Sequence, residues 1–204
     1  IKNRVTEEEI KYWLPIVMEH FKILDPQTKN NSKALTPKEF WKFAVANKKE
    51  LGVFSAVIDS WNYMRHDVEG FSREDKWLED TLSFRNELAE RSKMHFHTII
   101  HPTKARKDKD GKTIPPDMHS LKGGSEWGNN GKSIIIVDRE FTSNISTIIV
   151  AKAKPKVVGL RGTATICYDV VKGCYYEFVN GQRKEAKLMV ENQNNLINIT
   201  TNEF

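Results

Sequence analysis

Asp59 follows an apolar run, residues 53–58, that is typical of a strand buried on both faces of a parallel sheet. Open α/β sheets bind ligands beyond the carboxyl ends of their strands, and a single Asp there is the form of a Mg²⁺ site in nucleotide hydrolases. The carboxylate would hold the metal directly or through water. An Asp at a strand end also caps the next element in many proteins, so its position alone leaves a structural role open.

Three histidines, His95, His97 and His101, alternate along and just beyond the next expected strand, residues 94–100, and so project from one face. Such a row is typical of a zinc site, and together with Asp59 it would define a metal-dependent hydrolase. No Cys or acidic residue adjoins the row, and His101 lies beyond the reach of a metal held by His95. We therefore expect His95 and His97 to be packed and hydrogen-bonded. His101 differs because it follows the carboxyl end of its strand, as Asp59 does.

Two Gly-Lys-Ser/Thr tripeptides, residues 111–113 and 131–133, match the end of a phosphate-binding loop. Neither fits, because two prolines follow the first and the second leads into an apolar strand where a helix is required. The segment over residues 122–130 is a better candidate, since its glycines allow close approach of the backbone to a phosphate and its lysine adds charge. Trp127 in this segment could stack on a base, but packing against the domain is the role we expect.

The 204-residue chain has a formal net charge of +5, and its basic excess lies in one stretch. Between His101 and Arg161 there are twelve Lys/Arg and six Asp/Glu, whereas the rest of the chain is nearly neutral. This concentration indicates a polyanionic partner, although a solvated lysine-rich loop gives the same pattern. Two cysteines are too few for a disulfide framework, and no apolar run is long enough to span a membrane. We therefore expect a soluble protein of a reducing compartment.

Capping boxes at Thr6 and Thr36 predict the start of two helices, the second of which should end before Gly52. Pro15 should kink or end the first helix early. A short buried strand is expected next, over residues 21–24.

A third helix of about twenty residues from Ser72 lies between the Asp59 strand and the strand at residues 94–100. This alternation of helices and strands predicts an α/β fold with a mostly parallel sheet. A long loop without periodicity should occupy residues 102–132. Four short strands closing the sheet in antiparallel fashion are expected over residues 134–137, 146–151, 164–168 and 175–178. We expect one domain over residues 1–180 and a polar, partly disordered tail over residues 181–204, with a short helix near residues 186–191.

Several of these segments, taken in order, resemble the RecA-like motor domain of DnaB-type replicative helicases, and in particular the phage and Twinkle-like primase–helicase branch. They are the Asp59 strand with Trp61 and Asn62, the long helix, the His-Pro-Thr-Lys strand end, the Gly-Gly-Ser loop and the closing strands. The likeness spans roughly residues 10–178. It implies a RecA-like P-loop NTPase core, ATP and Mg²⁺ as cofactors, single-stranded DNA as partner, and a hexameric ring in the full-length parent. It also implies a location in the cytoplasm of a bacterial or phage-infected cell.

The resemblance also implies a role for each matching residue. Asp59 would be the Walker B aspartate that holds Mg²⁺ on ATP, and His101 the polar sensor that links the γ-phosphate to the DNA-binding loop. Lys152 and Lys154 would reach across a subunit interface to the neighbour's ATP. The residues implied to contact single-stranded DNA are Lys104, Lys122, Gly123, Gly124, Ser125 and Asn129.

The sequence departs from the family's pattern in three places. Lys154 stands where the family has an arginine finger, which keeps the charge but loses the planar fork. Lys132 stands where an acidic residue is expected. The Walker A loop and the strand with the catalytic glutamate should precede the first helix, so Ile1 is expected to be an internal residue, and the fragment is not expected to hydrolyse ATP alone. Two alternatives stay open, namely the metal-dependent hydrolase and a non-enzymatic α/β nucleic-acid-binding module.

Overall fold

The computed structural model describes residues 5–24, 35–102, 106–107, 109–110, 113–121, 123–139 and 143–185. The chain divides into two compact units. Unit 1 comprises residues 1–3, 137–149 and 162–204, and unit 2 comprises residues 4–136 and 150–161. The expected domain over residues 1–180 with a separate tail stays a prediction.

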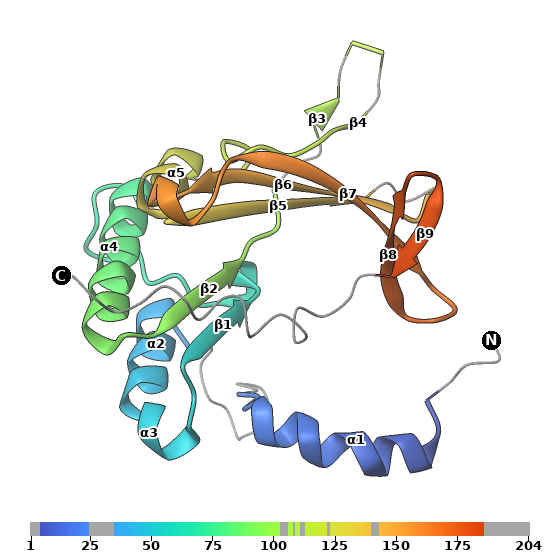
Figure 1. Ribbon diagram of the computed structural model, residues 1–204. Coiled ribbons are helices and arrows are strands. Elements are labelled where there is room, and N and C mark those ends of the chain that lie inside the picture. Colours follow the sequence, from blue (N-terminus) through green and yellow to red (C-terminus); the bar gives the residue numbers. More distant parts are fainter. Residues whose placement is uncertain are drawn as a thin grey trace. The chain divides into compact units, whose positions relative to one another are not determined.

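Unit 2 holds the helices and a pair of parallel strands (Figure 1). Its elements are α1 (Glu7–His20), α2 (Pro37–Ala46), α3 (Lys48–Leu51), β1 (Ser55–Asp59), a 3-10 turn (Trp61–Tyr63), α4 (Glu74–Ser92), β2 (His95–Ile99), β3 (Arg106–Lys107), β4 (Thr113–Ile114) and α5 (Gly124–Asn130). The predicted helices at residues 37–51 and near 74–92 and the predicted parallel strands are thus confirmed, with Gly52 in the left-handed conformation ending α3. The β1–β2 register runs from Ser55 opposite His95 to Asp59 opposite Ile99.

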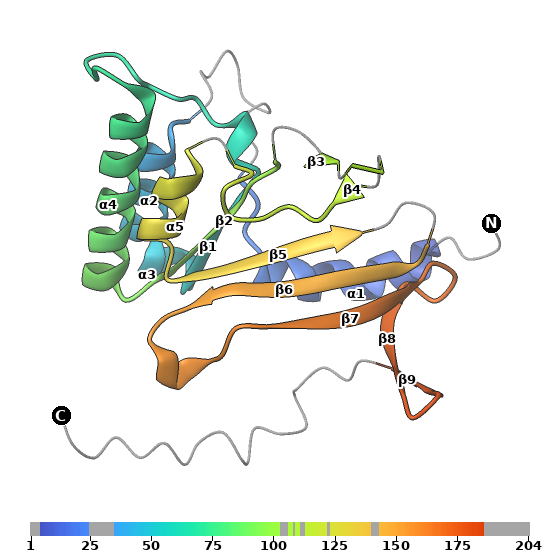
Figure 2. The same cartoon turned by 90° about the horizontal axis from the view of Figure 1, so that it is seen from above.

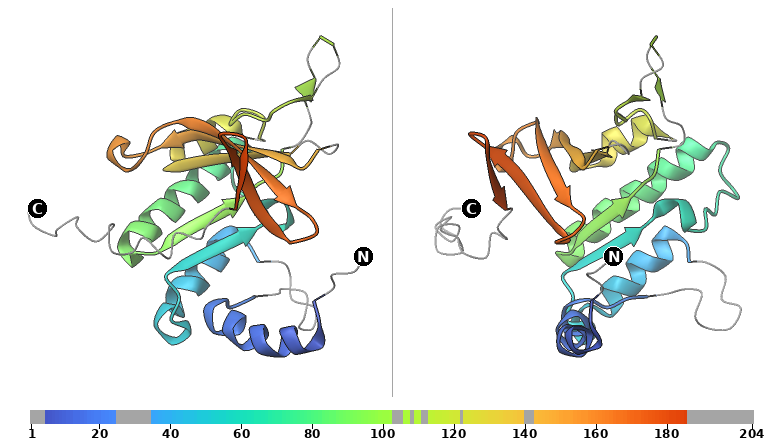
Figure 3. Two further views of the ribbon diagram at one scale, coloured as in Figure 1. Left: turned by 45° about the vertical axis from the view of Figure 1, so that its right-hand side comes forward. Right: turned by 90° about the vertical axis from the view of Figure 1, so that its right-hand side faces the viewer.

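One face of the β1–β2 pair is buried and the other is exposed. Ala56 and Ile58 of β1 are buried, whereas Val57 and Asp59 between them are exposed. Helices α2 and α4 cover the buried face through a core that includes Trp41, which is fully buried (Figure 3). The prediction of a strand buried on both faces was therefore wrong for the described part of the chain, because these helices cover only one of its faces.

Helix α1 begins at its predicted capping box, in which Thr6 and Glu9 bond each other reciprocally. It continues through Pro15 to His20, so the prediction of an early end was wrong; Pro removes only one backbone donor from the helix. No residue of α1 is buried. The expected buried strand at residues 21–24 was also wrong, because these residues pair with no described strand and are exposed.

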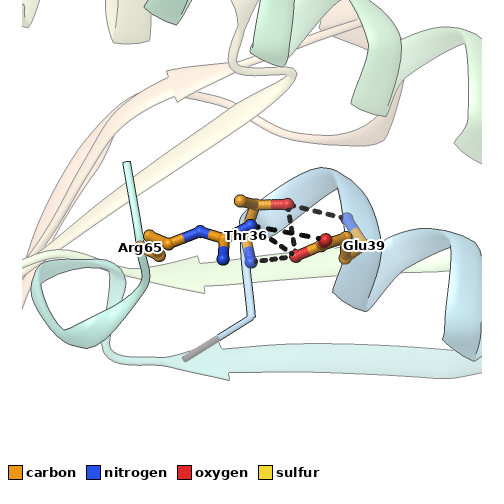
Figure 4. Close-up of polar contacts among 3 residues, drawn as sticks. All are labelled: Thr36, Glu39 and Arg65. Atoms are coloured by element: carbon orange, nitrogen blue, oxygen red, sulfur yellow. Dashed lines mark hydrogen bonds and ion pairs between the residues drawn. The ribbon is translucent and has the colours of Figure 1, made fainter. Parts of the chain in front are cut away.

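A second capping box fixes the start of α2 and is shown in Figure 4. The backbone N–H of Thr36 donates to Glu39 Oε2 at 2.7 Å, and the backbone N–H of Glu39 donates to Thr36 Oγ1 at 3.2 Å. Arg65 adds a long ion pair, with 3.4 Å between its Nη2 and Glu39 Oε1. The bonds from the Thr36 backbone and hydroxyl, with a smaller contribution from Arg65, lower the pKa of the Glu39 carboxyl. The box joins α2 to the segment that follows β1.

Replacing Thr36 with alanine is expected to lower the free energy of unfolding by about 1 kcal/mol, because α2 loses an N-cap acceptor beside a buried residue. Urea unfolding of the chain measures the change. Thr6→Ala is the matched control: it removes the same cap from α1, which buries nothing, and should leave the unfolding midpoint unchanged. If both variants lose the same free energy of unfolding, the larger effect expected at Thr36 from the packing of α2 is contradicted.

The same box predicts a pH dependence. Since the pKa of Glu39 is lowered on folding, its stabilising contribution is present above its ordinary value of 4.5 and is lost as the pH falls through the lower folded value. Wild-type protein should therefore be more stable than Glu39→Gln at pH 7, and the difference should shrink in acid. A difference that grows as the pH falls would contradict the prediction.

Unit 1 is built on an antiparallel sheet whose strand order is β5-β6-β7-β8-β9. The strands are β5 (Ser133–Arg139), β6 (Ile145–Ala153), β7 (Gly162–Asp169), β8 (Cys174–Val179) and β9 (Gln182–Glu185), with a 3-10 turn (Lys156–Val158) after β6. Figure 2 shows β5, β6 and β7 running in alternating directions, and β8 pairs antiparallel with both β7 and β9. The amino end of β5, the carboxyl end of β6 and the 3-10 turn after β6 belong to unit 2. The predicted closing strands are confirmed.

Two segments expected to lack strands contain them. β9 lies in the expected polar tail, and the predicted helix near residues 186–191 lies outside the described residues. The expected loop over residues 102–132 contains β3, β4 and α5. Helix α5 was not predicted because the segment around it is rich in glycine. Its Trp127 side chain is buried. Within the described ranges, no helix combines the length and apolarity needed to cross a membrane.

Candidate functional site

Asp59 and His101 lie at the same end of the β1–β2 pair. Asp59 is the last residue of β1, its register partner is Ile99, and His101 follows two residues later. Both are exposed. Asn62, in the turn after β1, accepts a hydrogen bond at 3.1 Å from the backbone N–H of His101 to its Oδ1. This bond ties the segment after β1 to the segment after β2, so the two predicted site residues are brought together as parallel strand ends require.

A pocket of about 270 Å³ opens beside these strand ends. Its polar lining includes Asn62, His101 and the two carboxylates at the start of α4, Glu74 and Asp75. Its apolar lining is a cluster of tryptophans and neighbouring side chains. The full lining is Trp61, Asn62, His66, Glu74, Asp75, Trp77, Leu78, Ile100, His101, Gly123 and Trp127.

The tryptophan cluster fixes the turn after Asp59. Trp61 packs edge-on against Trp127 of α5, with 4.9 Å between ring centroids, and against Trp77 of α4 at 5.9 Å. His66 also lies 4.9 Å from the Trp77 ring, and its Nε2 is 3.2 Å from the Trp61 carbonyl oxygen. The expected packing role of Trp127 is confirmed. The cluster holds β1, α4 and α5 together around the pocket.

The residues at this end suit a Mg²⁺ ion held mainly by a nucleotide. The Asp59 carboxylate is exposed and has no hydrogen-bond partner within the described part of the chain. The next residue, Ser60, is buried and its hydroxyl also lacks a partner there. Mg²⁺ is commonly bound through one or two carboxylates while phosphates and water supply its other ligands. Because no group of three or more His, Cys, Asp or Glu gathers among the described residues, this end offers a shared site and not an all-protein cage.

The histidines of β2 do not pack as expected. His95 and His97 are exposed on the open face of the strand pair, beside Val57 and Ile99, so the prediction that these two side chains are packed was wrong. Strand alternation predicted correctly that they share a face, but not that this face is the exposed one. Among the described residues, no group of three or more His, Cys, Asp or Glu that could hold a metal ion forms around them.

The predicted DNA-binding segment forms the start of a helix. Gly123 is the left-handed residue before α5 (φ 72°), and a Cβ there would overlap the Leu78 side chain. A Cβ at Gly124 would lie 2.8 Å from the Met118 carbonyl oxygen. These glycines therefore permit close packing of α5. Ser125 and Asn129 project from α5 and are exposed. Lys104 and Lys122 lie outside the described residues.

The two lysines of β6 and its end differ sharply. Lys154 is exposed, whereas Lys152 is buried, with 7% of its surface accessible. Lys152 Nζ donates to the carbonyl oxygens of Gly128 and, at 3.3 Å, of Asn129, the last turn of α5. Burial, followed by the nearby Lys154, lowers the pKa of Lys152. As it stands, Lys152 is engaged within its own chain and only Lys154 is presented to solvent.

Comparison with solved structures shows the fold of the chain. The structure titled a DnaB-like replicative helicase and its interactions with primase matches with a TM-score of 0.52 at 12% identity, covering 69% of this chain and 35% of that one. A second solved structure, titled as an ATPase domain, matches with a TM-score of 0.54 at 13% identity, covering 69% and 51%. The chain thus has the fold of a RecA-like ATPase domain of the DnaB type, as predicted.

A similar sequence is found in a Twinkle-type protein. The chain is 27% identical over 129 residues to the Twinkle homolog protein, chloroplastic/mitochondrial, of Arabidopsis thaliana. The match covers 61% of this chain and 18% of that protein. No protein-family model matches the sequence. These likenesses confirm the predicted resemblance to DnaB-type and Twinkle-like helicase motor domains, while the bacterial or phage-infected cell stays a prediction.

Proposed function

We propose that this chain is the Walker B half of a replicative DNA helicase motor, which couples ATP hydrolysis to translocation on single-stranded DNA. The observation that carries the proposal is the location of Asp59 and His101 at the same end of the parallel pair, where the backbone N–H of His101 donates a hydrogen bond to Asn62 in the turn after Asp59. Since the match covers only 18% of the length of the Twinkle homologue, ATPase and helicase activity are assigned to a full-length parent.

In this mechanism Asp59 would hold Mg²⁺ together with the phosphates of the nucleotide, and the ion would supply positive charge to stabilise the negative charge that develops during phosphoryl transfer. His101 senses the γ-phosphate. Its backbone bond to Asn62 holds it beside the segment that follows Asp59, so a shift at the nucleotide would reach the residues after β2. Lys154, exposed beyond the end of β6, is the cation that reaches the ATP of the neighbouring subunit in a hexameric ring.

Single-stranded DNA is the proposed partner of the basic stretch between residues 101 and 161. Gly123, Gly124, Ser125 and Asn129 lie at the start of α5 and along it. Lys104 and Lys122 precede α5 in the sequence. Lysines would supply charge to the phosphates, and exposed Ser and Asn side chains would supply hydrogen bonds that are independent of base sequence. Such contacts suit single-stranded DNA that is recognised through its sugar–phosphate backbone.

Salt dependence tests the DNA-binding role. The affinity of the full-length parent for single-stranded DNA should fall steeply with salt, with a slope of about −0.7 in log K against log salt for each phosphate contacted. Lys122→Ala should flatten this slope by about 0.7. Lys49→Ala, on the exposed α3, is the matched control and should leave it unchanged. A flat salt response of the wild-type protein would contradict the role.

A further inference from the structure

The carboxyl end of α5 is held by two buried cations from different elements. Lys152 of β6 donates to the carbonyl oxygens of Gly128 and Asn129. Arg85 of α4 donates from Nη2 to the carbonyl oxygen of Asn130 at 3.1 Å, and Asn86 Nδ2 donates to the same oxygen at 3.0 Å. The last three carbonyl groups of a seven-residue helix are therefore all bonded by side chains that come from outside it.

Burying these cations is costly, and the carbonyl groups are what offset the cost. Lys152 is 7% exposed and Arg85 is 9% exposed, and neither forms an ion pair within the described ranges. Desolvation lowers the pKa of both, and Lys154, Lys132 and Arg161 lower that of Lys152 further. The free carbonyl groups at a helix carboxyl end carry partial negative charge and accept from cations. Other cations therefore surround Lys152, and they oppose its burial. We attribute its buried position to its hydrogen bonds with the carbonyl groups of α5.

Through these bonds α5 connects the two regions that the proposed function assigns to different ligands. Its amino end begins at Gly123 and Gly124, in the DNA-binding segment. Its carboxyl end is bonded to Lys152, two residues before Lys154, the residue assigned to the neighbouring subunit's ATP. Trp127 in its middle packs on Trp61, next to the Asp59 segment. A displacement of Lys154 along β6 would thus be transmitted to α5 directly through Lys152.

We propose that Lys152 is a positioning residue, which couples the nucleotide-contacting end of β6 to the DNA-binding segment through the last carbonyl groups of α5. This inference rests on the proposed function, and it replaces direct contact of Lys152 with nucleotide, the role that the family resemblance implies. Lys152 and Lys154 then have separate tasks, one inside the subunit and one across the interface.

Steady-state ATPase assays on the full-length parent test the coupling. Lys152→Met keeps the length of the side chain but removes its donors, and it should lower the stimulation of ATPase by single-stranded DNA about tenfold. Lys152→Arg keeps a buried cation and should restore most of the stimulation. The affinity for a fluorescent ATP analogue should stay the same in both variants. Lys156→Met, an exposed lysine four residues further on, is the matched control and should match wild type throughout.

Three outcomes overturn the proposal. The first is loss of nucleotide affinity in Lys152→Met, because direct phosphate contact would then explain the residue. The second is unchanged DNA stimulation in that variant. The third is an unchanged rate of amide hydrogen exchange in the 204-residue chain at Gly131, whose N–H donates to the Trp127 carbonyl oxygen at the end of α5. This exchange should be faster in Lys152→Met without any DNA or nucleotide. A wild-type parent that lacks DNA-stimulated ATPase would refute the proposed function instead, and the exchange measurement separates the two failures.

Discussion

Asp59→Ala is expected to lower the DNA-stimulated ATPase rate of the full-length parent by about 100-fold or more, since the variant loses the carboxylate proposed to hold Mg²⁺ where charge develops. Folding should be unaffected, because the Asp59 side chain is exposed and makes no hydrogen bond within the described part of the chain. Initial rates measured with and without single-stranded DNA, over a range of Mg²⁺ concentrations, provide the check.

A nearby carboxylate serves as the control for Asp59. Asp67 is exposed on the segment between β1 and α4 and has no assigned role, so Asp67→Asn should keep the wild-type rate. If Asp59→Ala retains full activity, the Mg²⁺-binding role is wrong. If the wild-type parent binds single-stranded DNA but does not hydrolyse ATP, the chain belongs to a binding module and the motor function is refuted.

The largest expected effect on stability comes from Trp61. It is 6% exposed and packs against Trp41, Trp77, Trp127 and His66, so its side chain joins α2, α4 and α5 to the turn after β1. Trp61→Ala should lower the free energy of unfolding by about 3–5 kcal/mol, the cost of lost burial and of the cavity that remains. Urea unfolding of the chain followed by far-ultraviolet circular dichroism measures the change.

The chain contains a matched tryptophan for this experiment. Trp13 of α1 is 56% exposed, and its one ring contact among the described residues is the edge-on contact with its neighbour Tyr12. Trp13→Ala should therefore change the free energy of unfolding by less than about 0.5 kcal/mol. A comparable loss in both variants would mean that α1 is packed in solution and that the core around Trp61 is not the principal source of stability.

Features with a local cause could be predicted from the sequence. The apolar run that stops at Asp59 and the strand that stops before His101 are local patterns, and parallel pairing brings their ends together without further information. The capping boxes at Thr6 and Thr36 are likewise complete within four residues. The position of the candidate site followed from these elements.

Features with a tertiary cause could not be predicted. The burial of Lys152 depends on carbonyl groups 23 and 24 residues earlier in the chain, and nothing in its own segment signals them. Helix α5 is stabilised by Trp127 in the tryptophan cluster, against a glycine-rich sequence that favours a loop. Strand alternation placed His95 and His97 on one face, but which face the helices cover is decided by packing.

The distribution of tryptophan over the two units has an optical consequence. All five tryptophans belong to unit 2, and four of them have ring contacts in its core, whereas unit 1 contains none and carries Tyr168, Tyr175 and Tyr176. Tryptophan emission therefore reports on unit 2 alone, and tyrosine absorbance includes unit 1. Thermal scans recorded with both signals distinguish a single cooperative transition from separate melting of the units, with no added label.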